Sequence, residues 1–147
     1  MSTIRGEEAR HYFLRWLMHV NSSPDIGITI VHDSPVDVLW RTDPAQPWIG
    51  VQVKRAYYKT NAVFPVVNMT RWDDRRYKGN DADWLVAIDL ETDRMWWIPW
   101  KRASKYTRLT LNEKWDQYML YIEPKEAQQC KRLPDDKAGD WDATFKF

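Results

Sequence analysis

The chain has 147 residues, of which 44% are hydrophobic and 29% are charged, and its formal net charge is +1. This composition predicts one globular domain spanning residues 1–147, with no apolar run long enough to cross a membrane. The single cysteine, Cys130, excludes an internal disulfide framework and a cysteine-based zinc site. Together with the polar N-terminus, it favours a cytoplasmic protein.

Residues 6–20 are expected to form an amphipathic helix, because Phe13, Trp16, Leu17 and Val20 recur at helical spacing. Five apolar runs are typical of strands, namely residues 26–32, 35–41, 48–58, 84–90 and 94–100. A less regular segment, 59–80, separates the third run from the fourth, and a weaker element follows between Leu109 and Ile122. This order predicts an α/β or α+β fold with a mixed sheet.

Three polar side chains stand out within the strand-like runs. Asp37 belongs to the run 35–41, whereas Gln52 and Lys54 lie two residues apart in the run 48–58 and so share one strand face. A carboxylate, an amide oxygen and an amine from neighbouring strands form a minimal site for phosphodiester hydrolysis. The alternative is an acid at a strand edge beside a solvated sheet face.

In the hydrolytic interpretation, Asp37 holds Mg²⁺ directly, because Mg²⁺ prefers oxygen ligands. Gln52 adds its side-chain oxygen or positions a water, and the backbone carbonyl of Val53 joins the same ion. Lys54 orients the attacking water or stabilises charge in the transition state. A neutral Gln52 where a carboxylate would be usual lowers the negative charge of the site and weakens cation binding.

This arrangement resembles the PD-(D/E)XK nuclease superfamily. The family's Pro-Asp corresponds to Pro35-Val36-Asp37 and its (D/E)-x-K to Gln52-Val53-Lys54, a variant similar to that of the group I intron homing endonucleases. The likeness covers about residues 5–100 and includes Arg5-Gly6, Tyr57, Tyr77-Lys78-Gly79, Asp83 to Val86, and the closing WWIPW.

The resemblance implies a restriction-endonuclease-like core, in which helices flank a central mixed sheet. It also implies a bacterial or phage-encoded hydrolase that cleaves DNA with Mg²⁺, or with Mn²⁺ in vitro. The sequence departs from the family pattern on the first helix, where the family often has Gly-x-x-Ala-Glu. Here Arg10 follows Ala9, so Glu7, or as a second choice Glu8, would complete the metal site. Both acids have a simpler explanation, since acids in a first turn favour the helix dipole.

Because the net charge is close to zero, DNA binding depends on where the charges lie. The segments 71–78 and 101–108 are locally basic. The candidate DNA-binding residues are Arg55, Lys59, Arg71, Arg75, Arg76, Lys78, Lys101, Arg102 and Lys105, with Asn61, Asn68 and Thr70 as additional polar contacts. For each of them, a solvated surface position is the alternative. One chain carries one hydrolytic centre, so cutting a duplex requires a homodimer or homotetramer.

Three functions follow from these observations. The first is a metal-dependent DNA endonuclease with a homing or restriction-like role. The second is a catalytically inactive nucleic-acid-binding module on the same fold, which the neutral Gln52 and the displaced helix acid favour. The third is a carbohydrate- or ligand-binding module that uses some of the ten tryptophans as a platform, and such a module would be mainly β without the helix at 6–20.

Overall fold

The computed structural model describes residues 4–20, 25–28, 34–70 and 77–121. Its helices are α1 (Ile4–Val20), α2 (Trp100–Ala103) and the 3-10 helix η1 (Glu113–Tyr118). Its strands are β1 (Asp25–Ile28), β2 (Val38–Arg41), β3 (Ile49–Arg55), β4 (Val66–Asn68), β5 (Trp84–Asp89), β6 (Arg94–Pro99), β7 (Arg108–Thr110) and β8 (Met119–Tyr121). No helix in these residues is both long and apolar enough to pass through a bilayer.

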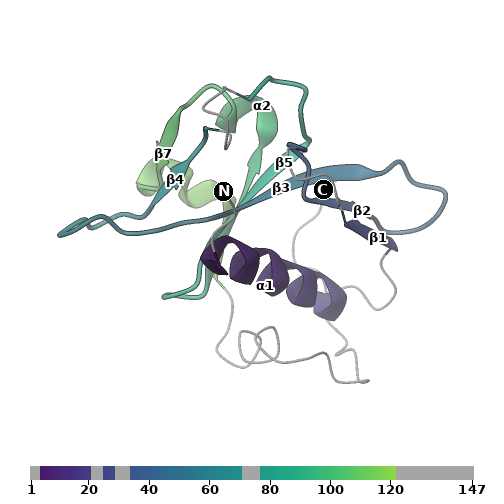
Figure 1. Ribbon diagram of the computed structural model, residues 1–147, viewed down its shortest axis with the longest axis horizontal. Helices are drawn as coiled ribbons and strands as arrows, with labels where there is room; N and C mark the ends of the chain where they lie inside the picture. The colour runs from purple at the N-terminus through teal and green to yellow at the C-terminus, as the bar shows by residue number, and fades with distance from the viewer. Residues whose placement is uncertain (1–3, 21–24, 29–33, 71–76, 122–147) are drawn as a thin grey trace.

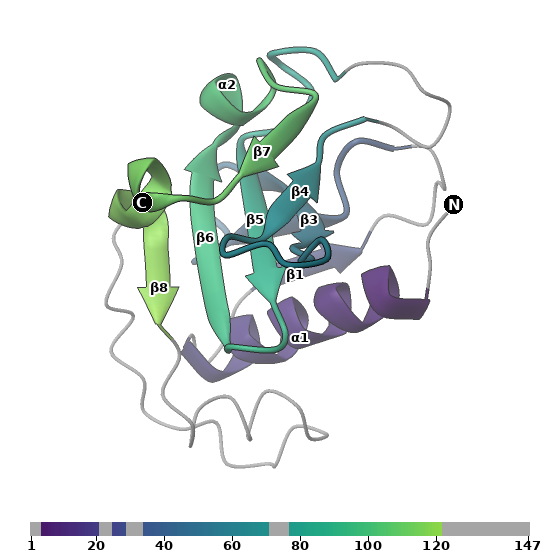
Figure 2. The same cartoon turned by 90° about the vertical axis from the view of Figure 1, so that its left-hand side faces the viewer.

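A six-stranded mixed sheet forms the centre of the fold. Its strand order is β1-β2-β3-β5-β6-β8, and only the pair β3–β5 is parallel. The neighbouring strands β5, β6 and β8 lie side by side in Figure 2. The predicted mixed sheet is therefore confirmed, with β3 and β5 at its middle.

Helix α1 covers one face of this sheet, as its sequence pattern predicts. Ala9, Phe13 and Leu17 follow one another at four-residue steps and are fully buried. They share a core with Val51 and Val53, the residues directly before and after Gln52 in β3. Figure 1 shows α1 on one side of the sheet and β4, β7 and α2 on the other.

The second face differs from the expectation of flanking helices. It is covered by a small sheet of β4 and β7 together with the short helices α2 and η1. Val67 of β4 and Leu109 of β7 are buried there against Trp96 and Trp100. Each of these two strands has three residues, so neither produced a recognisable period in the sequence.

Two strand boundaries also differ from the predicted runs. The second strand begins at Val38, because Pro35 has no N–H to give to a ladder and the N–H of Val36 donates to Ser34 Oγ at 3.2 Å. The third strand ends at Arg55, because Tyr57 leaves the central sheet and forms a bridge with Val66.

Most of the described tryptophans are core residues, as expected from their number. Trp97 lies 5.4 Å from the ring of Phe13 and 6.0 Å from that of Trp16, which are favourable aromatic separations. Its neighbour Trp96 points to the opposite core, next to Trp100. The burial of these rings and the presence of α1 argue against a tryptophan platform for carbohydrate.

Candidate active site

Asp37 and Gln52 meet across the pair β2–β3. The antiparallel register pairs Val38 with Val51, and continuing it by one residue sets Asp37 opposite Gln52. The backbone N–H of Asp37 donates to Val51 O at 2.9 Å, so the pairing begins before β2 itself. The side chains are in direct contact, since Gln52 Nε2 donates to Asp37 Oδ2 at 2.7 Å.

The Asp37 carboxylate is held in a mostly buried position. Its Oδ2 also accepts the backbone N–H of Val53 at 2.9 Å. Burial raises the pKa of Asp37, and this effect exceeds the opposing influence of the Val53 hydrogen bond and of the charges of Lys54 and Arg10. An ionised Asp37 is therefore under-compensated by the protein, which is a favourable environment for a cation.

Lys54 shares this environment. Burial lowers the pKa of its ammonium group, whereas the charge of Asp37 acts in the opposite direction. Its Nζ lies 5.3 Å from the centre of the Tyr77 ring, within the range of a cation–π contact. An acid just before β2 and an amine on β3 thus lie near each other in the central sheet.

The Gln52 carboxamide has a specific orientation. Its Nε2 donates to Asp37 Oδ2 and lies 3.4 Å from the carbonyl oxygen of Val53, so the NH₂ group faces two oxygens. Its Oε1 is buried and accepts no hydrogen bond from the part of the chain that the structure describes. A buried acceptor without a partner costs about 1–3 kcal/mol. Unsatisfied groups of this kind mark sites where an ion or water belongs.

The two candidate acids of α1 differ in their surroundings. Glu7 forms an ion pair with Arg10 one turn later, and the charges of both residues act on Asp37. Glu8 is exposed and is not among the charges that influence Asp37. The sequence also favoured Glu7 over Glu8, because Glu7 lies one helical turn before Arg10, the position at which the family often has its acid. The Glu7 carboxylate is, however, already paired with Arg10.

Asp83 fixes the position of the strand that carries Gln52. Its Oδ2 accepts the N–H of Gly50 at 2.7 Å, and its own N–H donates to Gly50 O at 2.9 Å. A Cβ atom at Gly50 would lie 3.1 Å from Val36 Cγ2, so a side chain here would press on the segment that carries Asp37. Asp83 therefore has a structural role, because it positions the start of β3.

The metal-binding capacity of the site is limited. In residues 4–20, 25–28, 34–70 and 77–121, no group of three or more His, Cys, Asp or Glu side chains could hold an ion. The site offers one carboxylate, the Gln52 amide and the Val53 carbonyl. This donor set fits Mg²⁺, which binds oxygen and is often held by one or two carboxylates while it keeps several waters.

The candidate DNA-binding residues lie in two places among the described residues. Lys78 is tied to α2, since Trp100 Nε1 donates to its carbonyl oxygen at 2.7 Å, and α2 carries Lys101 and Arg102. Arg55 ends β3, and Lys59 follows it on an exposed turn. Lys105 is exposed after α2, and Arg71, Arg75 and Arg76 lie outside the described residues.

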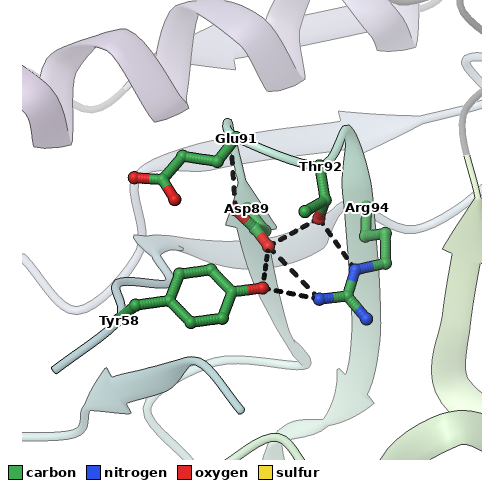
Figure 3. A network of polar contacts seen from close by, with 5 residues as sticks. All are labelled: Tyr58, Asp89, Glu91, Thr92 and Arg94. Carbon is green, nitrogen blue, oxygen red and sulfur yellow. Dashed lines mark hydrogen bonds and ion pairs between the residues drawn. The ribbon is translucent and has the colours of Figure 1, made fainter. Parts of the chain in front are cut away.

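A second polar cluster was not anticipated from the sequence (Figure 3). Asp89 is 1% exposed, and its Oδ2 accepts the hydroxyls of Tyr58 at 2.7 Å and Thr92 at 2.6 Å. Its Oδ1 accepts the N–H of Glu91 at 3.0 Å, and Arg94 donates to Tyr58 at 2.7 Å and to Asp89 at 3.4 Å.

The hydrogen bonds around Asp89 decide its ionisation. Burial raises its pKa, but the bonds from Thr92, Tyr58, Glu91 and Arg94 outweigh that effect and leave the pKa below its usual range. Burial also raises the pKa of Tyr58, and Asp89 adds to the effect. A lone acid at the end of the buried run 84–90 was the only sequence signal for this cluster.

Comparison with known structures identifies a similar fold. The bacterial homing endonuclease I-Ssp6803I matches with a TM-score of 0.60 and 23% sequence identity, over 75% of this chain and 77% of that chain. The present chain has the same restriction-endonuclease-like fold, as its resemblance to the PD-(D/E)XK superfamily implied. No family model and no curated protein sequence matches the chain.

Proposed function

We propose that this chain, which has the restriction-endonuclease-like fold, is a metal-dependent DNA endonuclease with a homing or restriction-like role. The observation that carries the proposal is the contact between Asp37 and Gln52, with Lys54 beside them, on the middle strands of the central sheet. These are the three positions at which the PD...QVK motif requires functional groups.

The proposed Mg²⁺ or Mn²⁺ ligands are Asp37, the side-chain oxygen of Gln52 and the backbone carbonyl of Val53. A half-turn of the Gln52 carboxamide would exchange its NH₂ group for Oε1 beside Asp37, where a bound cation would be the shared partner of both oxygens. When bound, the ion would activate a water and stabilise charge on the scissile phosphate.

The remaining groups act through their positions. The Lys54 ammonium would orient the attacking water or donate to a phosphate oxygen as negative charge develops there. Glu7 or Glu8 would supply a further ligand, and Glu7 would first have to leave Arg10. We propose duplex DNA as the substrate and a homodimer or homotetramer as the active form, because each chain has one hydrolytic centre.

A cleavage assay tests the proposal. The protein is incubated with a duplex library of random sequence and Mg²⁺, and new DNA ends are sequenced, with EDTA as the metal-free control. The wild type should produce ends at recurring sequences, whereas Asp37→Ala and Lys54→Ala should produce none while still binding DNA. Normal cutting by either variant would contradict the assigned roles.

A catalytically inactive nucleic-acid-binding module is the second candidate. The specific observation in its favour is that the site has one carboxylate, beside which the NH₂ group of Gln52 takes the place of a cation. This module would bind the library with the same affinity in Mg²⁺, Mn²⁺ and EDTA and would cut it in none of them.

A further inference from the structure

The chain between β3 and β4 forms a narrow hairpin, here called the β3–β4 arm (residues 57–65). Figure 1 shows it projecting from the body of the molecule. Tyr57 and Val66 pair at its base through backbone hydrogen bonds of 3.0 and 2.8 Å. The turn at its tip is closed by a bond of 3.0 Å from the N–H of Ala62 to the carbonyl of Lys59.

The base of the arm is fixed to the central sheet. Tyr58 donates to the buried Asp89 at the end of β5 and accepts from Arg94 at the start of β6 (Figure 3). These contacts hold the arm at a defined angle to β3, although its tip packs against no core. A fixed base and an unsupported tip are typical of an element that contacts another molecule.

The tip presents polar and apolar groups to solvent. Val63 is 79% exposed, the highest value among the exposed large hydrophobic residues of the described chain. Asn61 is exposed at a φ of 61°, and its side chain makes no hydrogen bond with residues that the structure describes. Lys59 is exposed beside them.

The charge of the arm limits its partner. No Asp or Glu occurs from Pro44 to Trp72, a stretch that contains Lys54, Arg55 and Lys59. An element with only positive charge, continuous with the strand that carries Gln52 and Lys54, fits a polyanion. By contrast, the β2–β3 hairpin at the other end of β3 carries Asp43 at its exposed tip.

We propose that the β3–β4 arm enters the major groove of duplex DNA and reads A·T pairs there, an inference that rests on the proposed endonuclease function. The major groove admits a two-stranded β-ribbon. The Asn61 carboxamide matches the donor and acceptor on the edge of adenine, and the Val63 methyl groups match the thymine methyl, which lies only in that groove. Lys59 contacts a phosphate and sets the depth of the arm.

The covalent link through β3 limits where these bases lie. Asn61 follows Lys54 by seven residues, which is at most about 23 Å at roughly 3.3 Å per residue. That reach corresponds to about seven base pairs at roughly 3.4 Å per pair. The preferred A·T pairs should therefore lie within about seven base pairs of the cleaved phosphate.

A selection with chemically altered DNA tests this contact. Wild type, Asn61→Ala, Val63→Ala and the matched control Gln46→Ala, at the tip of the β2–β3 hairpin, each select from two random duplex pools in EDTA. One pool contains thymine and the other contains uracil, which lacks the methyl group. Circular dichroism confirms that each variant is folded.

Wild type and Gln46→Ala should select A·T pairs at fixed positions and bind the thymine pool several-fold more tightly than the uracil pool. Val63→Ala should bind both pools equally. Asn61→Ala should lose preference for adenine at one position by about 5- to 100-fold, the range of one bidentate base contact.

The inference about the arm is wrong if both arm variants select the same sequences as wild type and lose as much affinity as wild type when uracil replaces thymine. It is also wrong if they change the oligomeric state in place of base preference, since the arm would then be a contact between protein chains. If the wild type binds DNA selectively but does not cleave it in Mg²⁺, the proposed endonuclease function is wrong and the proposed role of the arm still holds. A folded wild type that binds neither pool would overturn both.

Discussion

The sheet carries a mostly buried acid, Asp37, and a fully buried acid, Asp89, and their surroundings shift their pKa values in opposite directions. Asp89 receives hydrogen bonds from Tyr58, Thr92, Arg94 and the backbone of Glu91, and its pKa lies below the usual range. Within the part of the chain that the structure describes, Asp37 receives hydrogen bonds on Oδ2 alone, and burial raises its pKa. The ionised Asp89 stabilises the fold, whereas the ionised Asp37 is destabilising.

This difference separates structural from functional use of a carboxylate. A carboxylate that is fully supplied with donors has no remaining capacity for a ligand, and its role is to fix the elements around it. A carboxylate left short of donors keeps that capacity at a cost in stability, as functional sites commonly do. The following experiments, from the largest expected effect to the smallest, test whether the two clusters differ in this way.

Replacing the acid of the proposed active site should separate activity from stability. Asp37→Asn should lower the cleavage rate by about 10³-fold or more, since it removes the anionic metal ligand. The same change should raise the free energy of unfolding by about 1 kcal/mol, because an uncompensated buried charge is removed. Single-turnover cleavage and urea denaturation measure the two quantities. If Asp37→Asn loses stability as well as activity, Asp37 stabilises the fold in the same way as Asp89.

Replacing the acid of the second cluster should have the opposite outcome. Asp89→Ala should lower the free energy of unfolding by about 3 kcal/mol, because Tyr58, Thr92 and Arg94 lose their buried acceptor. The matched control is Glu91→Gln, since Glu91 contributes its backbone N–H while its side chain points away from the cluster (Figure 3). Equal urea midpoints for the two variants would show that the Asp89 cluster contributes nothing to the free energy of unfolding.

The two acids should also give opposite pH dependences of stability. The pKa of Asp89 is below 3.8 in the folded protein, so its contribution is present above 3.8 and is lost as the pH falls through the folded value. The folded pKa of Asp37 is above 3.8, so the protonated Asp37 contributes stability below pH 3.8. That stability is lost as the pH rises through the folded pKa of Asp37.

Urea denaturation between pH 3 and pH 6 measures this dependence. Wild type should lose stability on acidification more steeply than Asp89→Asn, with a difference of at most about 1 kcal/mol over this pH range. Parallel curves would indicate that Asp89 has the same pKa in the folded and unfolded states.

Adding a second carboxylate beside Asp37, at position 52, tests whether this position binds the metal ion. Gln52→Glu should raise the affinity for Mn²⁺ by about tenfold, because ligand charge tunes cation binding. Without metal it should be slightly less stable than wild type, since two carboxylates would then face each other. Calorimetric titration with Mn²⁺ gives the affinity directly. Unchanged Mn²⁺ binding would show that position 52 is not a ligand.

The sequence predicted those parts of the fold that have long, regular patterns. The helix at 6–20 and five of the strands were found because their apolar residues repeat over at least four positions. The strands β4, β7 and β8 have three residues each and depend on partners distant in the sequence, so no local pattern identifies them.

The candidate site also has features that the sequence predicts and features that appear only in the structure. The shared face of Gln52 and Lys54 follows from the two-residue period of a strand, and the contact with Asp37 follows from an antiparallel neighbour. The orientation of the Gln52 amide depends on the backbone of Val53 and on the burial of Oε1, which appear only in three dimensions. The Asp89 cluster joins Tyr58 to a turn 31 residues later, a separation at which sequence alone gives no register.

The position of β3 between two hydrogen-bonded neighbours has a consequence for how this protein can change. An insertion or deletion of one residue within β3 would turn Gln52 and Lys54 to the face that packs against α1 and would place Val51 and Val53 in the candidate site. A change of length is therefore tolerated only outside β3. A change of composition at the tip of the β3–β4 arm would alter the bases that the arm contacts and would leave Gln52 and Lys54 on their face of the sheet.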